Sequence, residues 1–320
     1  MHNILIIGAG QLGSRHLQGA LLSPNELKIT VIDPSSESLN IAKESAGQVE
    51  YGNKNSTVSY SNELPLNENV DVCIIATAAQ VRAAVTKQLL DKNQVEHIVF
   101  EKVLFQKIAD YSEISALLAE ISTTGWVNCP RRSFPTYTAL KQQLDTSKPI
   151  NMVVEGHAWG MACNSVHFLD VFAFLAENST LELVESKLDS ELIESKRIGF
   201  YETTGQLSFT AGNHTLTIQS GQEETPQLSV SLVNGETRFV VNEVEGVWTK
   251  SQGENTEQFT HQPLFQSQLT GGTVDQLLSS NTCGLTPFEQ SCNLHVPFIN
   301  ALLVHMSVVL EKELDACPIT

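Results

Sequence analysis

Basic residues are scarce in this sequence. Among its 320 residues, 19 are lysine or arginine and 36 are aspartate or glutamate, which gives a formal net charge of -17 at pH 7. Nucleic acids and anionic lipid surfaces bind dense clusters of positive charge, because their phosphate groups have to be neutralised. The shortage of such charge argues against a nucleic-acid partner and against a membrane-surface partner.

Long hydrophobic runs are also lacking. We find no stretch of the roughly 18 to 20 apolar residues that a helix needs to cross a bilayer. The apolar strand that begins at Ile4 is short and has no basic flank, which does not fit a secretory signal peptide. We therefore expect a globular protein that stays in the cytoplasm.

Cysteine pairs with metal-binding spacing are missing. The six cysteines are scattered and none forms a C-x-x-C pair, so we expect reduced thiols. Cys163 and His167 stand four residues apart on one expected helix face, and His157 is close in sequence. This grouping leaves a metal site open as an alternative, but no fourth ligand accompanies it. We expect no bound metal.

The first 125 residues alternate short apolar runs with longer helical stretches. Strands are expected at NILIIG (3–8), KITVID (28–33), VDVCIIAT (70–77) and HIVFEK (97–102), with a further short run, WVN, at 126–128. Helices are expected from Gln11 to Leu22, from about Ser36, from Ala79 to Leu90 and from about Ala109 to Ile121. Such alternation is typical of parallel βαβ units, and the nearly continuous valine and isoleucine suit a sheet covered on both faces. The pattern predicts a doubly wound parallel sheet in a domain of residues 1–125.

The second part of the chain, residues 126–320, has a different pattern of hydrophobic residues. Six short, partly alternating runs begin at residues 151, 181, 205, 214, 227 and 237. Alternation is typical of antiparallel strands with one solvated face. Two helices are expected as well, at about 164–176 and about 287–314. We predict an α+β domain with an open, mainly antiparallel sheet, which makes the whole chain an α/β protein of two domains.

A glycine-rich motif follows the first expected strand directly and opens the first helix. It reads Gly8-Ala9-Gly10-Gln11-Leu12-Gly13, which is the G-x-G-x-x-G fingerprint of a Rossmann dinucleotide-binding domain in its proper context. Gly8 permits the tight turn, Gly10 lets the backbone approach a pyrophosphate, and Gly13 lets the helix pack on the strand. The helix N-terminus, with Gln11 and Leu12, supplies N–H groups to the phosphates.

Two residues at later strand ends extend this expected cofactor site. Asp33 ends the second strand about 20 residues beyond the motif, where a carboxylate accepts hydrogen bonds from the adenosine ribose and repels a 2'-phosphate. It therefore favours NAD over NADP, although an aspartate can also simply end a strand before the Pro34 turn. Thr77 ends another parallel strand, where such sheets open their ligand crevice. A plain strand-ending role for Thr77 is equally open.

Several segments together resemble the Gfo/Idh/MocA family of oxidoreductases. They are GAGQLGSRH, DVCIIATAA, IVFEKV, VNCPRRSFPTYTALKQQL and GLTPFEQSCNLHVPFINALL, and the segment around His167 to Asp170 adds to them. The resemblance covers essentially the whole chain. It implies that Lys102, in place of the lysine of an E-K-P motif, and His167 flank the reacting carbon beside the nicotinamide. It also implies an open sheet that forms homodimers or homotetramers, and a sugar, nucleotide-sugar or other polyol as substrate.

Three positions depart from the family pattern. The proline of E-K-P is Val103, so the backbone that aims Lys102 is not held in the usual way. Arg82, which follows Thr77-Ala78, replaces the family's histidine a few residues beyond the T-P turn. Cys163 replaces the carboxylate usually found four residues before the catalytic histidine. The departures weaken the expected chemistry more than the expected fold.

Oxidation of an alcohol needs a base and a group that stabilises charge on oxygen. We expect the ammonium of Lys102 to bind the substrate oxygen and His167 to exchange the proton, because its ordinary pKa lies near working pH. Asn164 would orient the substrate, and we count Glu101 with the cofactor-binding residues. His167 can instead be a core histidine on an apolar helix. The functional alternatives are a dinucleotide-binding sensor or assembly protein without turnover, and an epimerase or lyase that keeps its NAD bound.

Overall fold

The computed structural model describes residues 1–195, 197–260 and 264–320, and the chain divides into two compact units. Unit 1 contains Met1–Phe105, Ala109–Asn128 and Leu264–Glu289. Unit 2 contains Gln106–Ile108, Cys129–Pro263 and Gln290–Thr320. A segment late in the sequence therefore packs with the first unit.

Unit 1 is built on a seven-stranded sheet in the order β15-β6-β5-β4-β1-β2-β3. The strands are β1 (His2–Ile7), β2 (Leu27–Ile32), β3 (Thr57–Ser61), β4 (Asn69–Ile75), β5 (Gln94–Glu101), β6 (Thr124–Asn128) and β15 (Thr286–Pro287). Six of them pair in parallel, and the short β15 adds to β6 antiparallel. The helices are α1 (Gln11–Leu21), α2 (Ser36–Ala46), α3 (Ala79–Lys92), α4 (Ile108–Glu120) and α7 (Gln266–Ser280).

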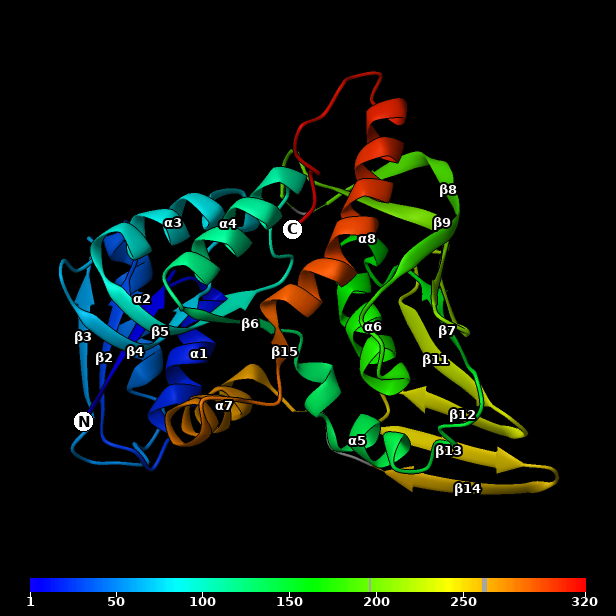
Figure 1. Ribbon diagram of the computed structural model, residues 1–320, viewed down its shortest axis with the longest axis horizontal. Coiled ribbons are helices and arrows are strands. Elements are labelled where there is room, and N and C mark those ends of the chain that lie inside the picture. Colours follow the sequence, from blue (N-terminus) through cyan, green and yellow to red (C-terminus); the bar gives the residue numbers. More distant parts are fainter. Residues whose placement is uncertain (196, 261–263) are drawn as a thin grey trace. The chain divides into compact units, whose positions relative to one another are not determined.

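Helices cover both faces of this sheet. The core on one face joins strand residues such as Ile4 and Val72 to Leu17 of α1, Leu39 of α2 and Leu277 of α7. α3 and α4 lie on the opposite face (Figure 1). Because side chains on both faces are covered, the strands can be almost continuously apolar, as the sequence pattern indicates. The predicted doubly wound sheet is confirmed.

α7 packs against α1 at very short range. A Cβ at Gly19 of α1 would lie 2.8 Å from the Cβ of Thr270, and a Cβ at Gly271 would lie 2.6 Å from the carbonyl oxygen of Gly19. Any larger side chain at either position would push the two helices apart. The pair of glycines therefore fixes α7 on the first helix of the Rossmann unit.

Unit 2 contains an eight-stranded sheet in the order β14-β13-β12-β11-β7-β10-β9-β8. The strands are β7 (Ile150–His157), β8 (Glu182–Glu194), β9 (Tyr201–Ala211), β10 (His214–Gly221), β11 (Gln227–Asn234), β12 (Thr237–Asn242), β13 (Val247–Gln252) and β14 (Asn255–Thr260). All neighbours are antiparallel except β7 and β10. α6 (Met161–Ala176) lies against this sheet, with α5 (Pro135–Lys141) and a short 3-10 turn (Pro130–Ser133) beside it. The predicted mainly antiparallel sheet is confirmed.

The last helix, α8 (Phe288–Val309), corrects one expectation. With 22 residues it is long and apolar enough, by length and composition, to cross a membrane. The expectation that the chain has no such run is therefore wrong. A core helix of a globular protein passes the same test, and Phe298, Ile299 and Leu302 of α8 are fully buried. Length and composition alone do not assign α8 to a membrane.

Candidate functional site

The glycine motif forms the turn between β1 and α1. Gly8 has a φ of +101°, and a Cβ there would lie 2.9 Å from the backbone of Ala76. A Cβ at Gly13 would lie 1.8 Å from the carbonyl oxygen of Gly8. A Cβ at Gly10 would meet nothing within 4 Å. The protein itself therefore requires the first and third glycines, whereas the space beside Gly10 is left for something else.

The start of α1 offers unused backbone donors at the same place. The first helical hydrogen bond runs from the N–H of Ser14 to the carbonyl of Gly10. The N–H groups of Gln11, Leu12 and Gly13 precede it, and the first N–H groups of a helix have no acceptor within the helix. Gln11 and Leu12 are exposed. Such a helix N-terminus suits the phosphates of a dinucleotide.

Asp33 lies directly beyond β2 and binds the glycine turn. One carboxylate oxygen, Oδ2, accepts from the N–H of Ala9 at 2.8 Å, and the other, Oδ1, accepts from the N–H of Ser35 at 2.8 Å. The side chain is half-buried. Each carboxylate oxygen has a second lone pair, so Asp33 can hold the turn and still accept hydroxyl groups.

Thr77 lies between the end of β4 and the start of α3. Its buried hydroxyl has no hydrogen-bond partner among the residues that the structure describes. Buried hydroxyls in proteins normally have a partner. Together with the open space at Gly10 and the amides of α1, this hydroxyl fits a site that receives a dinucleotide, so the predicted cofactor residues suit that group.

Lys102 is half-buried and follows β5 directly, and its peptide bond to Val103 is cis. The segment Val103–Phe105 after it is fully buried. The guanidinium of Arg82, on α3, donates from Nη1 to the carbonyl oxygens of Glu101 at 2.7 Å and Leu104 at 2.8 Å, and also to that of Val103. Nη2 donates to the carbonyl of Thr77. One buried cation therefore joins the two strand ends that carry Thr77 and Lys102.

Glu101, at the end of β5, is 3% exposed and belongs to a polar network inside unit 1. Its Oε1 accepts from Asn128 at 2.5 Å and lies 2.8 Å from Nε2 of His16. Nδ1 of His16 lies 3.0 Å from the hydroxyl of Thr270 on α7. Burial raises the pKa of Glu101, but the hydrogen bonds from His16 and Asn128 and the charge of Arg82 outweigh it and lower the pKa overall. Glu101 is thus a buried carboxylate held by protein groups.

The remaining predicted residues, His167 and Asn164, lie on α6 in unit 2. His167 is 8% exposed and sits in the buried run Ser165–Asp170. Asn164 is half-buried and donates from Nδ2 to the carbonyl of Trp159 at 2.8 Å. Asp170 forms an ion pair with Arg132 at 3.0 Å. Lys102 and His167 therefore belong to different units.

Arg82, Asn128, Gln266 and Thr270 were not predicted as site residues. The sequence marks Arg82 only as a departure from a family pattern. Its four hydrogen-bond partners are backbone carbonyl groups, so no side chain near them in the sequence indicates the contact. Gln266 donates to Thr270, and its side-chain oxygen accepts from Asn128 at 2.8 Å. Gln266 and Thr270 both belong to α7, a helix far along the chain that the sequence pattern does not indicate.

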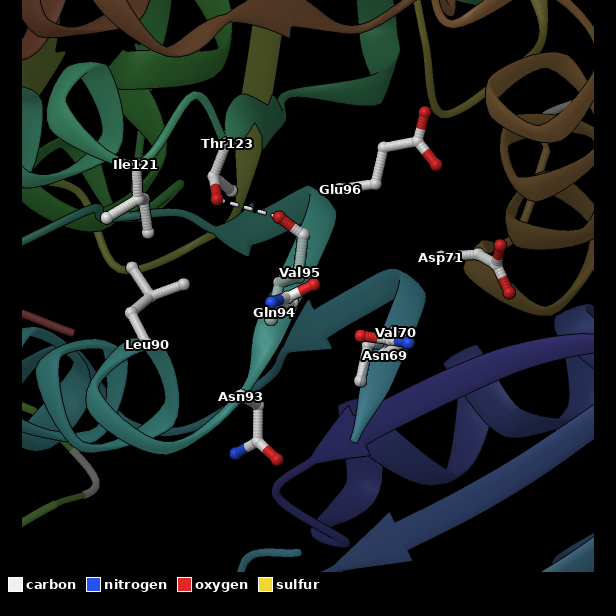
Figure 2. Close-up of a pocket in the computed structure, with 10 residues that line it drawn as sticks. All are labelled: Asn69, Val70, Asp71, Leu90, Asn93, Gln94, Val95, Glu96, Ile121 and Thr123. Carbon is white, nitrogen blue, oxygen red and sulfur yellow. Dashed lines mark hydrogen bonds between the residues drawn. The ribbon is translucent and has the colours of Figure 1, made fainter. Parts of the chain in front are cut away.

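A surface hollow of about 550 Å³ lies elsewhere in unit 1 (Figure 2). It is lined by residues at the amino ends of β4 and β5, including Asn69, Asp71, Gln94 and Glu96. Ligands of open α/β sheets bind beyond the carboxyl ends of the strands, which is where the glycine motif lies. This hollow is therefore at the opposite end of the sheet from the candidate site. Among the described residues, no three His, Cys, Asp or Glu side chains gather as metal ligands.

Comparison with known proteins supports this picture. No curated protein matches the chain. A family model described as "Oxidoreductase family, NAD-binding Rossmann fold", that of Gfo/Idh/MocA, matches residues 2–129. The chain is also similar in structure to a UDP-N-acetylglucosamine 3-dehydrogenase from Acidithiobacillus ferrooxidans, with a TM-score of 0.67, 14% identity and coverage of 98% of both chains.

Two further solved structures are similar over nearly their whole length. A Gfo/Idh/MocA family oxidoreductase from Vibrio cholerae has a TM-score of 0.68 and 14% identity, with coverage of 98% of this chain and 100% of that one. A 3-ketoreductase from Actinomadura kijaniata, in complex with TDP-benzene and NADP, has a TM-score of 0.67 and 15% identity, with coverage of 94% and 96%. At such low identity these likenesses establish the fold. Residues 2–129 match the model of the NAD-binding Rossmann domain of the Gfo/Idh/MocA oxidoreductases, and nearly the whole chain shares the fold of one solved oxidoreductase of that family.

Proposed function

We propose that this protein is an NAD-dependent oxidoreductase that transfers a hydride to or from a secondary alcohol carbon of a sugar, nucleotide-sugar or cyclitol. The observation that carries the proposal is the placement of Lys102. It follows the carboxyl end of β5, and the glycine motif follows the carboxyl end of β1 in the same parallel sheet. Ligands bind at that edge of an open α/β sheet. The names of two structural relatives, a nucleotide-sugar dehydrogenase and a ketoreductase, support the substrate class.

The proposed chemistry divides an alcohol oxidation between two side chains. When bound, NAD supplies the carbon that accepts the hydride from the substrate. The ammonium of Lys102 donates a hydrogen bond to the substrate oxygen and stabilises its developing negative charge. The imidazole of His167 takes the proton that leaves this oxygen, and Asn164 orients the substrate without titrating.

Asp33 supports NAD as the cofactor. Its carboxylate would accept the ribose hydroxyls of NAD and repel the 2'-phosphate of NADP. The next four residues, Pro34 to Glu37, contain no basic side chain to bind that phosphate. Glu101 is already bound by His16 and Asn128, so we propose that it supports the cofactor site from behind.

We also propose that the protein acts in the cytoplasm as a homodimer or homotetramer. The sequence resemblance is the basis for this assembly, and light scattering at several protein concentrations measures it. A monomer at all concentrations would refute the assembly.

The activity itself is tested by following absorbance at 340 nm with NAD and a panel of sugars, nucleotide-sugars and cyclitols, and with NADH and the matching ketones. We expect turnover with at least one member of the panel. Lys102→Met should keep its affinity for NADH and lose roughly 100-fold or more in kcat, which is typical for a group that stabilises charge on oxygen. Lys107→Met is the matched control, because Lys107 is an exposed lysine that pairs with Asp315.

The outcomes separate the alternatives. Normal turnover of Lys102→Met would remove this lysine from the mechanism. NADH binding by the wild-type protein without turnover on any member of the panel would favour the dinucleotide sensor or assembly protein. NAD that stays bound through purification, with conversion of substrate but no net NADH, would favour an epimerase or lyase.

A further inference from the structure

We propose that Arg82 is the positioning residue that aims Lys102 at the substrate. This inference rests on the proposed function of Lys102 and identifies the part of the chain that orients it. Proline, which restricts the backbone in the family motif, is replaced here by Val103. The side chain of Arg82 takes over the restriction through hydrogen bonds to the backbone.

Arg82 donates hydrogen bonds to backbone carbonyl groups on both sides of Lys102 in the sequence. Its guanidinium binds the carbonyl immediately before Lys102, which belongs to Glu101, and the carbonyls of the two residues after it, Val103 and Leu104. A fourth bond reaches the carbonyl of Thr77 at the neighbouring strand end. The guanidinium is planar and rigid, so fixing its position fixes these carbonyl groups relative to one another. The direction in which Lys102 leaves the backbone follows from them.

Arg82 keeps its charge in this environment. The residue is 2% exposed, and burial lowers its pKa to about 10, although the charges of Glu101 and Tyr111 act in the opposite direction. At neutral pH the guanidinium is therefore still a cation. Hydrogen bonds from a cation are shorter and stronger than those between neutral groups. The two N–H groups of Nη1 share three carbonyl acceptors and Nη2 binds the fourth, so one rigid cation supports all four carbonyl groups.

The segment Val103–Phe105 also makes apolar contacts, which bury it but do not orient it. Val103, Leu104 and Phe105 are fully buried and apolar, and Phe105 packs against Phe100 and Phe288. These contacts keep the segment inside unit 1 whether or not Arg82 is present. Apolar contacts have no preferred direction, whereas hydrogen bonds to carbonyl oxygens do. We therefore assign to Arg82 the orientation of the segment and to the apolar residues its burial.

The test compares Arg82→Met and Arg82→Lys with Lys87→Met. Lys87 is the matched control, because it is a cation on the same helix but pairs with Glu113 at the surface. Hydrogen exchange followed by mass spectrometry reports on the peptide that contains residues 101–105. We expect roughly tenfold faster exchange there in Arg82→Met, with the glycine turn unchanged, because the hydrogen bonds of Arg82 reach residues 101–104 and Thr77 but not that turn. Lys87→Met should match the wild type.

Turnover gives the second readout, on a substrate found by the panel above. Arg82→Met should lose roughly 100-fold in kcat, the scale expected when a catalytic group is misplaced by about 1 Å. Arg82→Lys should recover part of the loss, since it keeps the charge but has fewer donors. If Arg82→Met does not fold, Arg82→Lys alone carries the comparison with Lys87→Met.

Unchanged exchange in the 101–105 peptide, or faster exchange with unchanged kcat, would overturn the proposal. If the wild type has no turnover, the proposed function is refuted, but the role of Arg82 can still be tested. Acetic anhydride labelling of lysines then reports whether Arg82 positions Lys102. We then expect the labelling of Lys102, relative to Lys107, to change in Arg82→Met and to stay the same in Lys87→Met. An unchanged ratio in both variants would refute the role of Arg82.

Discussion

Gly10→Val and Gly13→Ala should separate cofactor binding from folding within one six-residue motif. The two glycines differ in what a side chain would meet. The space around a Cβ at Gly10 is open to 4 Å, whereas a Cβ at Gly13 would lie 1.8 Å from the oxygen of Gly8. A methyl carbon and a carbonyl oxygen in contact stay about 3.3 Å apart or more. The Gly13 variant can therefore fold only if α1 moves away from the turn.

The magnitude follows from this overlap. Forcing an extra methyl group into a packed region costs about 1–3 kcal/mol, and rigid backbone on both sides of the contact places Gly13→Ala at or above the top of that range. Alanine gains about 1 kcal/mol over glycine inside a helix, which offsets only part of the loss. For a unit of this size, a net loss of about 2–3 kcal/mol lowers the Tm by about 4–12 °C.

Gly10→Val should behave in the opposite way. Gly10 has ordinary extended backbone angles, a φ of -65° and a ψ of -172°, which valine adopts without strain. We expect a loss of stability of about 1 kcal/mol or less, because the residue precedes the helix and makes no side-chain cap. The isopropyl group would occupy the space that a pyrophosphate needs, so affinity for NADH should fall by roughly 100-fold or more.

Thermal unfolding followed by circular dichroism measures the first effect, and fluorescence titration with NADH measures the second. The control is Gly10→Ala, which tests whether any side chain at this position destabilises the fold. The reasoning would be refuted if Gly10→Val lowered the Tm as much as Gly13→Ala, or if it bound NADH as tightly as the wild type.

Three further predictions address the cofactor, the base and the buried carboxylate. Titration with both cofactors should show tighter binding of NAD(H) than of NADP(H). Asp33→Ser should reduce the difference in affinity between the two cofactors. A wild-type preference for NADP(H) would contradict the role of Asp33. His167→Ala should bind NADH normally but lose most of its turnover, and normal turnover would leave His167 as a core residue. Glu101→Gln should lower the free energy of unfolding at pH 7 by about 1.5–3 kcal/mol, because hydrogen bonds to a charged group are lost. The pKa of Glu101 is lowered on folding, so its contribution is present above the unfolded value of about 4.3 and disappears as the pH falls through the folded value. The stabilities of the two proteins in urea unfolding should therefore converge as the pH falls from about 4.3 through the folded value, and a constant difference would exclude this origin.

The parts of the structure that could be predicted are those in which neighbours along the chain carry the signal. The strand that ends at Ile7, the glycine turn and the helix that begins at Gln11 were predicted within a residue or two. The turn has strict steric needs, which restrict Gly8 and Gly13 to one residue type. Asp33 and Thr77 could likewise be placed just beyond strands, because the apolar run that precedes each of them marks the strand in the sequence.

The surroundings of Lys102 could not be predicted, because they depend on side chains that meet from distant segments. Arg82 acts through backbone carbonyl groups, which every residue possesses, so the sequence around its partners carries no trace of the contact. His16 meets Glu101 and Thr270 across 85 and 254 residues, respectively. α7 was missed because its glycines, Gly271 and Gly272, lower helix propensity, whereas close packing on α1 requires the first of them.

The place of α7 in unit 1 has a consequence for the order in which the protein is made. The other helices of unit 1 and six of its strands have been synthesised by Asn128, but the segment that covers α1 begins only at Leu264. At about 5–20 residues per second, a ribosome needs about 7–27 s to cross that interval. During this time the apolar side of the nascent Rossmann sheet stays open where Val274 and Leu277 will later pack. The emerging chain is then a natural client for a chaperone, and a fragment that stops at residue 129 should aggregate unless the segment Leu264–Glu289 is supplied to it as a peptide.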